Sequence, residues 1–285
     1  MEEDRDQLDT DTLGIDCTPA LDSTPRHKIA IATPAYGEQV HSAYCDALVR
    51  TMRSLWVAGH DVAWVTNSLS SIRAGRADLA SKALASTAAT HIMWIDADVS
   101  WPVGAVEKLL AHDLPVVAGV YPKRRADLAF AANLAMKPGG TLRMRGEHLV
   151  EVEGIGFGFV LVKREVFEAI AKAHPEKHLH RLQPETSPLW PWTYDFFPDG
   201  PTGDGAIMGE DFGFCSLWRG LGGEVWADTS IVLRHHGQWA FTTGASPAEM
   251  LAPELAKMEA EGRIINVAAA AAATLPAAAQ IAPAQ

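Results

Sequence analysis

Short apolar runs alternate with longer stretches of helical periodicity over residues 28–121, and this alternation constrains the fold more than any other feature of the sequence. Short apolar runs bounded by turn signals are typical of buried strands, and here they occupy residues 28–33, 61–66, 91–96 and 114–121. The stretches between them that have helical spacing or are rich in alanine are 40–59, 71–86 and 103–110. This order of strands and helices predicts a parallel sheet with right-handed crossovers.

The alternation loosens after residue 125. We expect further strands near 127–134, 141–152, 157–163 and 230–234. Two more helices are expected at 164–173 and 209–221, with a Trp- and Pro-rich loop over 184–205 between them. The predicted fold class is therefore α/β: an open, mostly parallel sheet with a mixed second half, flanked by helices.

The two ends of the chain differ in composition from the rest. Residues 1–24 hold eight acidic residues and one basic residue, a net charge of −7, which leaves −4 of the total −11 for the other 261 residues. The acidic segment buries too little apolar surface to order itself, and the Ala- and Pro-rich tail has no amphipathic face. We therefore predict disordered ends at 1–26 and 267–285, one folded domain over 27–245, and a helical segment over 246–266.

The composition also argues against several classes of protein. No apolar run approaches the roughly 18–20 residues of a membrane helix, and the first twelve residues are acidic where a secretory signal would be basic and then apolar. The three cysteines lie far apart, which fits a reducing cytosol and predicts a cytoplasmic protein. The nearly neutral remainder has no basic stripe, which argues against nucleic-acid binding.

The motif Asp96-Ala97-Asp98 directly follows the apolar run 91–95. Ligands of open α/β sheets bind at the carboxyl ends of strands, and two carboxylates one residue apart can share a hard divalent cation with a diphosphate. Alternatively, these acids are solvated turn residues, with Ser100 capping the next helix. The place of the motif at a strand end, between two tryptophans, favours the metal site.

Two later motifs carry groups that such a site would need. Glu210 and Asp211 open a predicted helix, where the helix dipole alone favours acids. The functional alternative makes one of them a general base, already ionised at neutral pH. His235 and His236 follow the last predicted strand. A lone histidine there would usually be structural, but one of this pair could complete a metal shell of carboxylate oxygens.

Weaker signals point to phosphate or sugar. The basic residues that could pair with a diphosphate, or could equally be solvated surface charges, are Arg73, Arg76 and the run Lys123-Arg124-Arg125. The glycine run over 154–158 precedes an apolar strand instead of a helix, so it fails the dinucleotide fingerprint and indicates close backbone packing. The aromatic side chains over 190–197 form either a sugar-stacking wall or part of the core.

In this order the motifs resemble those of the GT-A class of nucleotide-sugar glycosyltransferases, in particular the family 2-like enzymes of bacteria and phages. The matching stretches are IAIATPAYG (29–37), IRAGRADLASKAL (72–84), HIMWIDADVSWPVGAVEKLL (91–110), VVAGVYPKR (116–124), GIGFGFVLVKREVFE (154–168) and MGEDFGFCSLWRGLGGEVWADTSIVLRHHG (208–237). The resemblance implies a GT-A fold and metal-dependent, inverting transfer of a sugar from a nucleotide-diphosphate sugar, with UDP favoured, to an acceptor hydroxyl.

The resemblance also implies roles for individual residues. Those that would bind the nucleotide sugar are Thr33, Pro34, Ala35, Tyr36, Arg73, Arg76, Asp96 and Lys123. Those that would hold Mn²⁺ or Mg²⁺ are Asp98, Asp96 and His235. His235 matches better than His236 because the family pattern there is His, any residue, Gly. Asp211 would deprotonate the acceptor hydroxyl, and Glu210 would help to place the acceptor.

Other hypotheses remain open. A haloacid-dehalogenase-type phosphatase also has a D-x-D after an apolar strand, but usually on the first strand of its domain, whereas two strand–helix units precede Asp96. A nucleotidyltransferase of similar fold would carry a Gly-rich basic loop after the first strand, which TPAYGEQV lacks. A third hypothesis is a protein that only binds nucleotide or sugar. The acceptor is undetermined among a glycan, a lipid-linked sugar, a protein and a modified DNA base.

Overall fold

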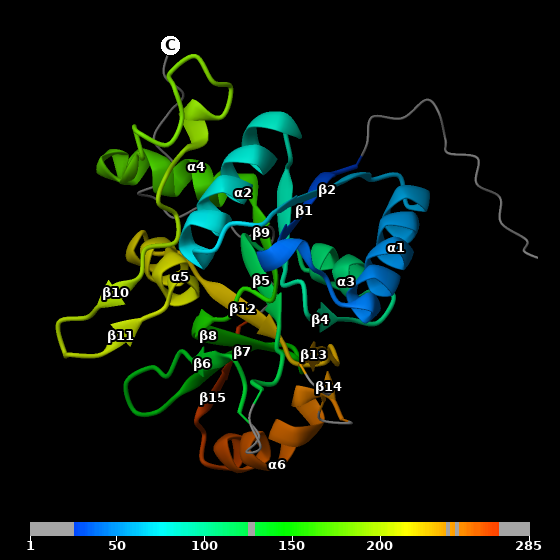
Figure 1. Ribbon diagram of the computed structural model, residues 1–285. Coiled ribbons are helices and arrows are strands. Elements are labelled where there is room, and N and C mark those ends of the chain that lie inside the picture. Colours follow the sequence, from blue (N-terminus) through cyan, green and yellow to red (C-terminus); the bar gives the residue numbers. More distant parts are fainter. Residues whose placement is uncertain (1–25, 125–128, 238–239, 243–244, 268–285) are drawn as a thin grey trace, which may run out of the picture.

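A ten-stranded sheet runs through the computed structural model, which describes residues 26–124, 129–237, 240–242 and 245–267 (Figure 1). Its strands are β1 (Lys28–Pro34), β2 (Asp61–Asn67), β3 (His91–Ile95), β5 (Val116–Gly119), β6 (Ala132–Leu134), β7 (Leu142–Arg145), β8 (Leu149–Ile155), β9 (Phe159–Lys163), β12 (Val225–Asp228) and β15 (Ile264–Asn266). From edge to edge they lie in the order β15-β7-β8-β12-β5-β9-β3-β1-β2, and β6 pairs with β8 beside this path.

The strand directions make the sheet mostly parallel. Strand β1 is parallel to both β2 and β3, β5 is parallel to β12, and β7 is parallel to β15. Strand β9 is antiparallel to its neighbours β3 and β5, and β8 is antiparallel to β12 and β7. Both reversed strands belong to the second half of the chain. The predicted α/β class, with a parallel first half and a mixed second half, is confirmed.

Helices cover both faces of the sheet (Figure 1). They are α1 (Ser42–Val57), α2 (Ile72–Ser86), α3 (Ala105–Ala111), α4 (Arg164–Ala173), α5 (Glu210–Gly220) and α6 (Pro247–Ala260). Strand β1 shows why two layers form. Its Ile29 and Ile31 are buried with side chains of α1 and α3, whereas Ala30 and Ala32 are buried with side chains of α2, α4 and α5. Successive side chains of a strand face opposite sides, so a strand that is apolar throughout needs cover on both faces.

Most predicted elements are present with shifted ends, and two predictions need correction. The single strand expected over 141–152 is two strands, β7 and β8, separated by a turn at Gly146, which has a φ of +58°. The final strand expected near 230–234 is wrong, because β12 ends at Asp228. The Asp228 carboxylate accepts a hydrogen bond from the main-chain N–H of Ser230 (2.8 Å), which turns the chain out of the sheet.

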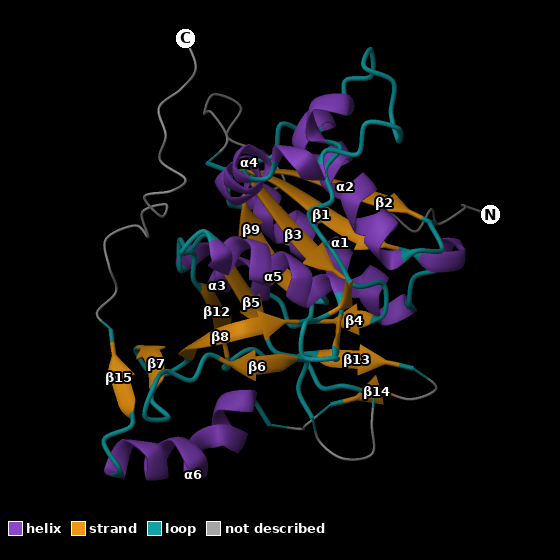
Figure 2. Cartoon of the chain, turned by 90° about the vertical axis from the view of Figure 1, so that its left-hand side faces the viewer, coloured by secondary structure: helices purple, strands orange, loops and turns teal. Residues whose placement is uncertain are grey.

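A small second sheet places the end of the chain beside the D-x-D motif. It consists of β4 (Val99–Ser100), β13 (Arg234–His236) and β14 (Ala240–Phe241), which lie together in Figure 2. His235 pairs with Val99, the residue after Asp98. Residues separated by more than a hundred positions in the sequence are therefore neighbours. At the end of the Trp- and Pro-rich loop, β10 (Gly200–Pro201) forms an antiparallel hairpin with β11 (Ile207–Met208), which lies just beyond the predicted loop.

The C-terminal segment expected to be helical contains α6 followed by β15, which extends the main sheet beside β7. None of the helices in the described ranges is long and apolar enough to cross a bilayer. The disordered ends predicted at 1–26 and 267–285 lie outside the described residues, apart from Arg26 and Val267.

Candidate functional site

Acidic side chains from separate parts of the sequence meet around one arginine. Arg76 lies on α2, Asp96 directly follows β3, and Glu210 and Asp211 begin α5. Arg76 Nη2 is 3.2 Å from Asp96 Oδ1 and 3.1 Å from Asp211 Oδ1, and Arg76 Nε is 3.3 Å from Glu210 Oε1. The structure thus brings four of the predicted site residues into one cluster at the carboxyl end of β3, where ligands of open α/β sheets bind.

Arg76 is the buried centre of this cluster. Its side chain lies among the rings of Trp94, Phe157 and Phe197, with centroids 5.7–5.9 Å from the guanidinium carbon. Burial acts to lower the pKa of Arg76, but the surrounding carboxylates outweigh it and raise that pKa, so the side chain stays charged. Its Nη1 atom is buried without a hydrogen-bond partner among the described residues. The Arg76 guanidinium therefore contacts three acids, and among the described residues its Nη1 N–H groups have no acceptor.

Asp211 is a largely buried acid whose pKa is raised. Burial raises the pKa of Asp211 to about 7, with the charges of Glu210 and Asp96 acting in the same direction and that of Arg76 opposing them. Its Oδ1 atom is buried and has no hydrogen bond to any described residue, although Arg76 is close. A carboxyl group with a pKa near neutral pH, and with an oxygen that accepts no hydrogen bond from the described residues, is suited to accept a proton from a bound molecule.

Asp98 turns away from this cluster towards His235. Asp98 Oδ1 is 3.5 Å from His235 Nε2. The His235 Nδ1 atom is 3.0 Å from the Pro122 carbonyl oxygen, and only a protonated Nδ1 can donate to that oxygen. This contact leaves a lone pair on Nε2, directed to the Asp98 side. Burial lowers the pKa of His235, which favours the neutral ring.

Arg124 lies between Asp98 and His235. Its Nη2 atom contacts the Asp98 carboxylate, and its Nε donates to His235 Nε2 at 2.9 Å. The guanidinium thus binds the same two groups that the sequence predicts as metal ligands. His236 makes other contacts: its Nε2 is 2.7 Å from Ser100 Oγ, and its ring stacks on His41. His235 is therefore the histidine of the pair that contacts the Asp98 carboxylate.

The donor set of Asp98 and His235 fits a divalent cation in part. A carboxylate oxygen is an ordinary ligand of Mn²⁺ and Mg²⁺. A neutral imidazole nitrogen, with Nδ1 fixed by a carbonyl, suits a transition-metal ion and not Mg²⁺. Asp96, the third predicted ligand, is bound to Arg76 instead, and no group of three such ligands is found within the described ranges. The protein would supply two ligands here, which is usual where substrate phosphates supply others.

A cavity of about 580 Å³ lies over the Arg76 cluster, Asp98 and Arg124. His236 lines it, whereas His235 lies behind Asp98 and is not among its lining residues. The residues around it are Pro34, Tyr36, Gln39, Val40, His41, Ile72, Arg76, Asp96, Ala97, Asp98, Arg124, Glu210, Asp211, His236 and Gly237. Of the residues predicted after the first strand, Pro34 and the exposed Tyr36 line it. Thr33 is buried, and its hydroxyl contacts Tyr44 and accepts a hydrogen bond from Trp64 Nε1 (3.0 Å). Ala35 is also buried.

Arg73 and Lys123 lie outside this cavity. Arg73 makes two hydrogen bonds to Asp195, Nε to Oδ1 at 3.0 Å and Nη2 to Oδ2 at 2.6 Å, and a third to Asp199 at 2.6 Å. These contacts tie α2 to the Trp- and Pro-rich loop, and the structure does not bring Arg73 to the other site residues. Lys123 lines a second cavity instead. The nucleotide-binding roles of both residues stay predictions.

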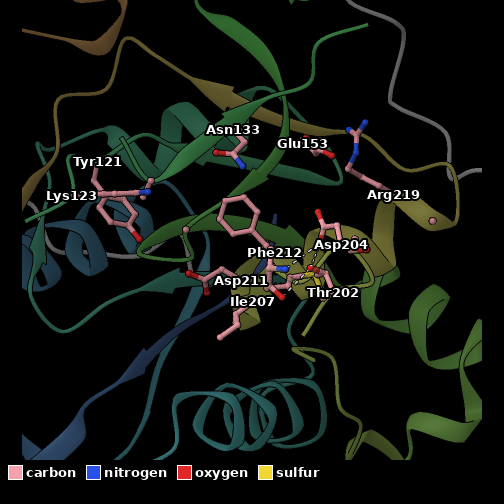
Figure 3. A pocket seen from close by; sticks show the side chains of 17 residues that line it. Tyr121, Lys123, Asn133, Glu153, Thr202, Asp204, Ile207, Asp211, Phe212 and Arg219 are labelled. Carbon is pink, nitrogen blue, oxygen red and sulfur yellow. Dashed lines mark hydrogen bonds between the residues drawn. The ribbon is translucent and has the colours of Figure 1, made fainter. Parts of the chain in front are cut away.

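The second cavity, of about 920 Å³, lies on the other side of Asp211 (Figure 3). Its polar and aromatic lining includes Tyr121, Lys123, Asn133, Glu153, Thr202, Asp204, Asp211, Phe212, Ser216 and Arg219. Sequence analysis missed Asn133, Glu153 and the hairpin residues, since β6, β8 and the hairpin meet only in the folded chain. Asp211 lines both cavities. The site therefore has two compartments that share one carboxyl group.

Comparison with known proteins adds little to this site. No protein family model and no curated protein matches the chain. Among solved structures it is similar to the crystal structure of A197 from STIV, with a TM-score of 0.44 and 16% identity over 74% of this chain and 86% of that chain. Likeness at this level says nothing about activity. The fold class rests on the strand order and pairing above, and the chemistry rests on the site itself.

Proposed function

We propose that this protein is a glycosyltransferase, which moves a sugar from a nucleotide-diphosphate sugar, with UDP favoured, to an acceptor hydroxyl. The observation that carries the proposal is the position of Asp211, whose carboxyl group lines two separate cavities. Transfer between two substrates needs a base at the place where they meet. The order of the D-x-D, the acidic pair and His235, and their convergence in space, supports the same activity.

The smaller cavity suits the donor. Asp98 would hold Mn²⁺ or Mg²⁺ there, with His235 as a further ligand of Mn²⁺, and the bound ion would supply positive charge to the leaving diphosphate. Asp96, held by Arg76, would face the ribose or the sugar. Pro34 and Tyr36, the latter 74% exposed, offer an apolar and aromatic surface against which a base can stack.

Asp211 would act as the general base. The acceptor oxygen forms a bond to the anomeric carbon, and its proton passes to the Asp211 carboxylate. The bond between the anomeric carbon and the diphosphate oxygen breaks, and the diphosphate leaves with the electron pair. Attack opposite the leaving group inverts the anomeric centre. Arg76 would keep the Asp211 carboxyl in place, and Glu210, on the same guanidinium, would help to position the acceptor.

Calorimetric titration with UDP, GDP and several nucleotide sugars, each with Mn²⁺ and with EDTA, tests the donor site. We expect metal-dependent binding of one nucleotide class. Asp98→Asn should weaken that binding by about tenfold or more, because it removes a charged ligand. Asp113→Asn, a substitution in an exposed acid that pairs with Lys163 away from the cavity, is the matched control. If neither EDTA nor Asp98→Asn changed the affinity for nucleotide, the proposed role of Asp98 as a metal ligand would be contradicted.

A folded protein that binds none of these nucleotides would overturn the glycosyltransferase proposal. Release of phosphate from a phosphomonoester by the same preparation would then favour the phosphatase hypothesis. Tight metal-dependent nucleotide binding without transfer or hydrolysis would favour the protein that only binds its ligand.

A further inference from the structure

We propose that the cavity of about 920 Å³ is the acceptor subsite and that it takes an uncharged, hydroxyl-rich acceptor, a saccharide. This inference rests on the proposed function, because it assigns the second substrate of the same reaction. Its volume lies within the range of roughly 300–1,000 Å³ that is usual for small-molecule sites. The shared carboxyl of Asp211 places any ligand of this cavity next to the base.

The floor of the cavity is aromatic because three glycines make room for two rings. A side chain at Gly154 would overlap the ring of Phe212, and one at Gly156 or Gly158 would overlap Tyr121. The glycine run that the sequence singled out thus packs closely against Phe212 and Tyr121, both of which line the cavity (Figure 3). An aromatic ring is a suitable surface for the C–H face of a sugar.

The wall of the cavity presents polar side chains to which the described residues offer no partner. Asn133 on β6 and Glu153 on β8 are exposed neighbours, since Asn133 pairs with Gly154 across the two strands. Neither side chain makes a hydrogen bond or an ion pair within the described part of the chain. An amide offers both donors and acceptors, and a carboxylate offers several acceptor sites. Together they match adjacent hydroxyl groups, each of which donates and accepts.

The charges of the lining argue against a polyanionic acceptor. Asp211, Glu153 and Asp204 are acids, and Lys123 and Arg219 are the bases around the cavity. Arg219 is bound to Glu151 Oε1 (3.2 Å) and to the Val152 carbonyl oxygen (3.2 Å). Three acids and two bases therefore line the cavity, and Asp211, with a pKa of about 7, is only partly charged at neutral pH, so the described lining is close to neutral. A nucleic-acid strand or a multiply phosphorylated sugar would find no net positive charge here, whereas a neutral polyol needs none.

The β10–β11 hairpin adds an apolar edge. Ile207 is 85% exposed, and it lines the cavity together with Met208. A large apolar side chain at the rim of a polar cavity offers a surface for the apolar face of a ligand. Thr202 and Asp204 lie on the same hairpin and are bound to each other and to Ala206. These contacts hold the hairpin in shape.

Saturation-transfer NMR in the presence of UDP and the diamagnetic ion Mg²⁺ tests the assignment. The probes are neutral methyl glycosides of glucose, galactose and N-acetylglucosamine, neutral disaccharides, glucose 6-phosphate, and a short single-stranded oligonucleotide. We expect neutral saccharides to bind and the two anionic probes not to bind. The double substitution Asn133→Ala/Glu153→Gln should weaken saccharide binding at least tenfold. Glu254→Gln, in an exposed acid on α6, is the control.

A second variant acts without removing any polar group. Ala206 is an exposed cavity residue on the hairpin, so Ala206→Trp should fill the cavity and weaken saccharide binding while UDP binding, measured by calorimetry, stays unchanged. Saccharide binding that is equal in wild type and both variants, no binding of any neutral saccharide, or binding of only the anionic probes would overturn this inference. If the wild-type protein did not bind UDP at all, the donor site would be refuted instead. Failure of the acceptor subsite and failure of the proposed function therefore give different results.

Discussion

Two buried ion clusters in this protein are opposite in charge. At the candidate site one guanidinium, Arg76, faces three carboxylates. In the second cluster one carboxylate, that of Glu151 on β8, faces three cations, Lys137, Arg143 and Arg219. Arg76 and Glu151 are each 1% exposed. The burial of the central residue and the number of opposite charges around it therefore do not distinguish a structural cluster from a functional one.

Hydrogen bonding separates them. Glu151 Oε1 accepts from Lys137 (2.9 Å) and Arg219 (3.2 Å), and its Oε2 accepts from Arg143 (2.9 Å). In the other cluster Arg76 donates hydrogen bonds to Glu210 and Asp96, but its Nη1 is buried without a hydrogen-bond partner among the described residues. Among these residues, Asp211 Oδ1 has only its ion pair with Arg76 Nη2 (3.1 Å). A buried polar atom without a partner costs roughly 1–3 kcal/mol. The satisfied cluster around Glu151 matches a structural role, whereas the cluster around Arg76 keeps polar atoms that, under the proposed function, a ligand would contact.

The largest expected effect comes from Asp211→Asn. We expect the transfer rate to fall by about 10²–10⁴-fold, because the amide cannot take the acceptor proton. Nucleotide binding and the free energy of unfolding should not decrease, since the substitution removes one of three like charges around Arg76. Rate assays with calorimetry and urea unfolding measure all three. Transfer at the wild-type rate would show that Asp211 is not the base.

The matching substitution in the second cluster should have the opposite outcome. Glu151→Gln removes the one anion that three cations share, and loss of a partner from a buried ion cluster costs about 3 kcal/mol. Urea unfolding should show this loss, while the affinity of the folded variant for nucleotide stays at the wild-type value. If Glu151→Gln abolished nucleotide binding and left stability unchanged, the division into a structural and a functional cluster would fail.

The pH dependence of Asp211 gives a further test of the difference between the two clusters. With a pKa of about 7, Asp211 loses its charge as the pH falls, so the transfer rate should drop about tenfold per pH unit well below 7. The contribution of Asp211 to the stability of the fold changes with pH in the opposite direction. Between pH 3.8, the ordinary pKa of an aspartate, and about pH 7, the folded protein binds more protons than the unfolded chain. Protonation of Asp211 therefore stabilises the folded protein at acid pH, and this stabilisation is lost as the pH rises through 7.

The difference in unfolding free energy between wild type and Asp211→Asn measures this contribution from pH 4 to pH 8. Taking the difference cancels other titrating groups. One of these is His91, whose pKa is lowered to about 4 by burial and by His27, so its contribution is lost as the pH falls from 6.5. A difference that stays constant across this range would contradict the raised pKa of Asp211.

The sequence is most informative where a local pattern decides the structure. Apolar runs specify β1 and β3, and therefore the sheet edge at which Asp96 lies. It is less informative where the fold chooses among similar side chains. Arg73 and Arg76 are equivalent as sequence signals and lie three residues apart on α2. Arg76 is nevertheless a buried partner of Asp211, whereas Arg73 forms an ion pair with Asp195. The second cavity has no local signal, because strands and a hairpin from distant segments build it.

The smallest expected effect concerns Arg124. Its guanidinium contacts the Asp98 carboxylate and takes the lone pair of His235 Nε2, so a cation that binds there must displace it. An exposed ion pair contributes about 0.2–1 kcal/mol, and Arg124→Gln should therefore tighten Mn²⁺ binding in the absence of nucleotide by up to about fivefold. Electron paramagnetic resonance of Mn²⁺ measures this. Arg50→Gln, in an exposed pair with Asp46, should change nothing, and Asp98→Asn should cancel the gain. Weaker Mn²⁺ binding in Arg124→Gln would mean that the guanidinium supports the cation site instead of competing for it.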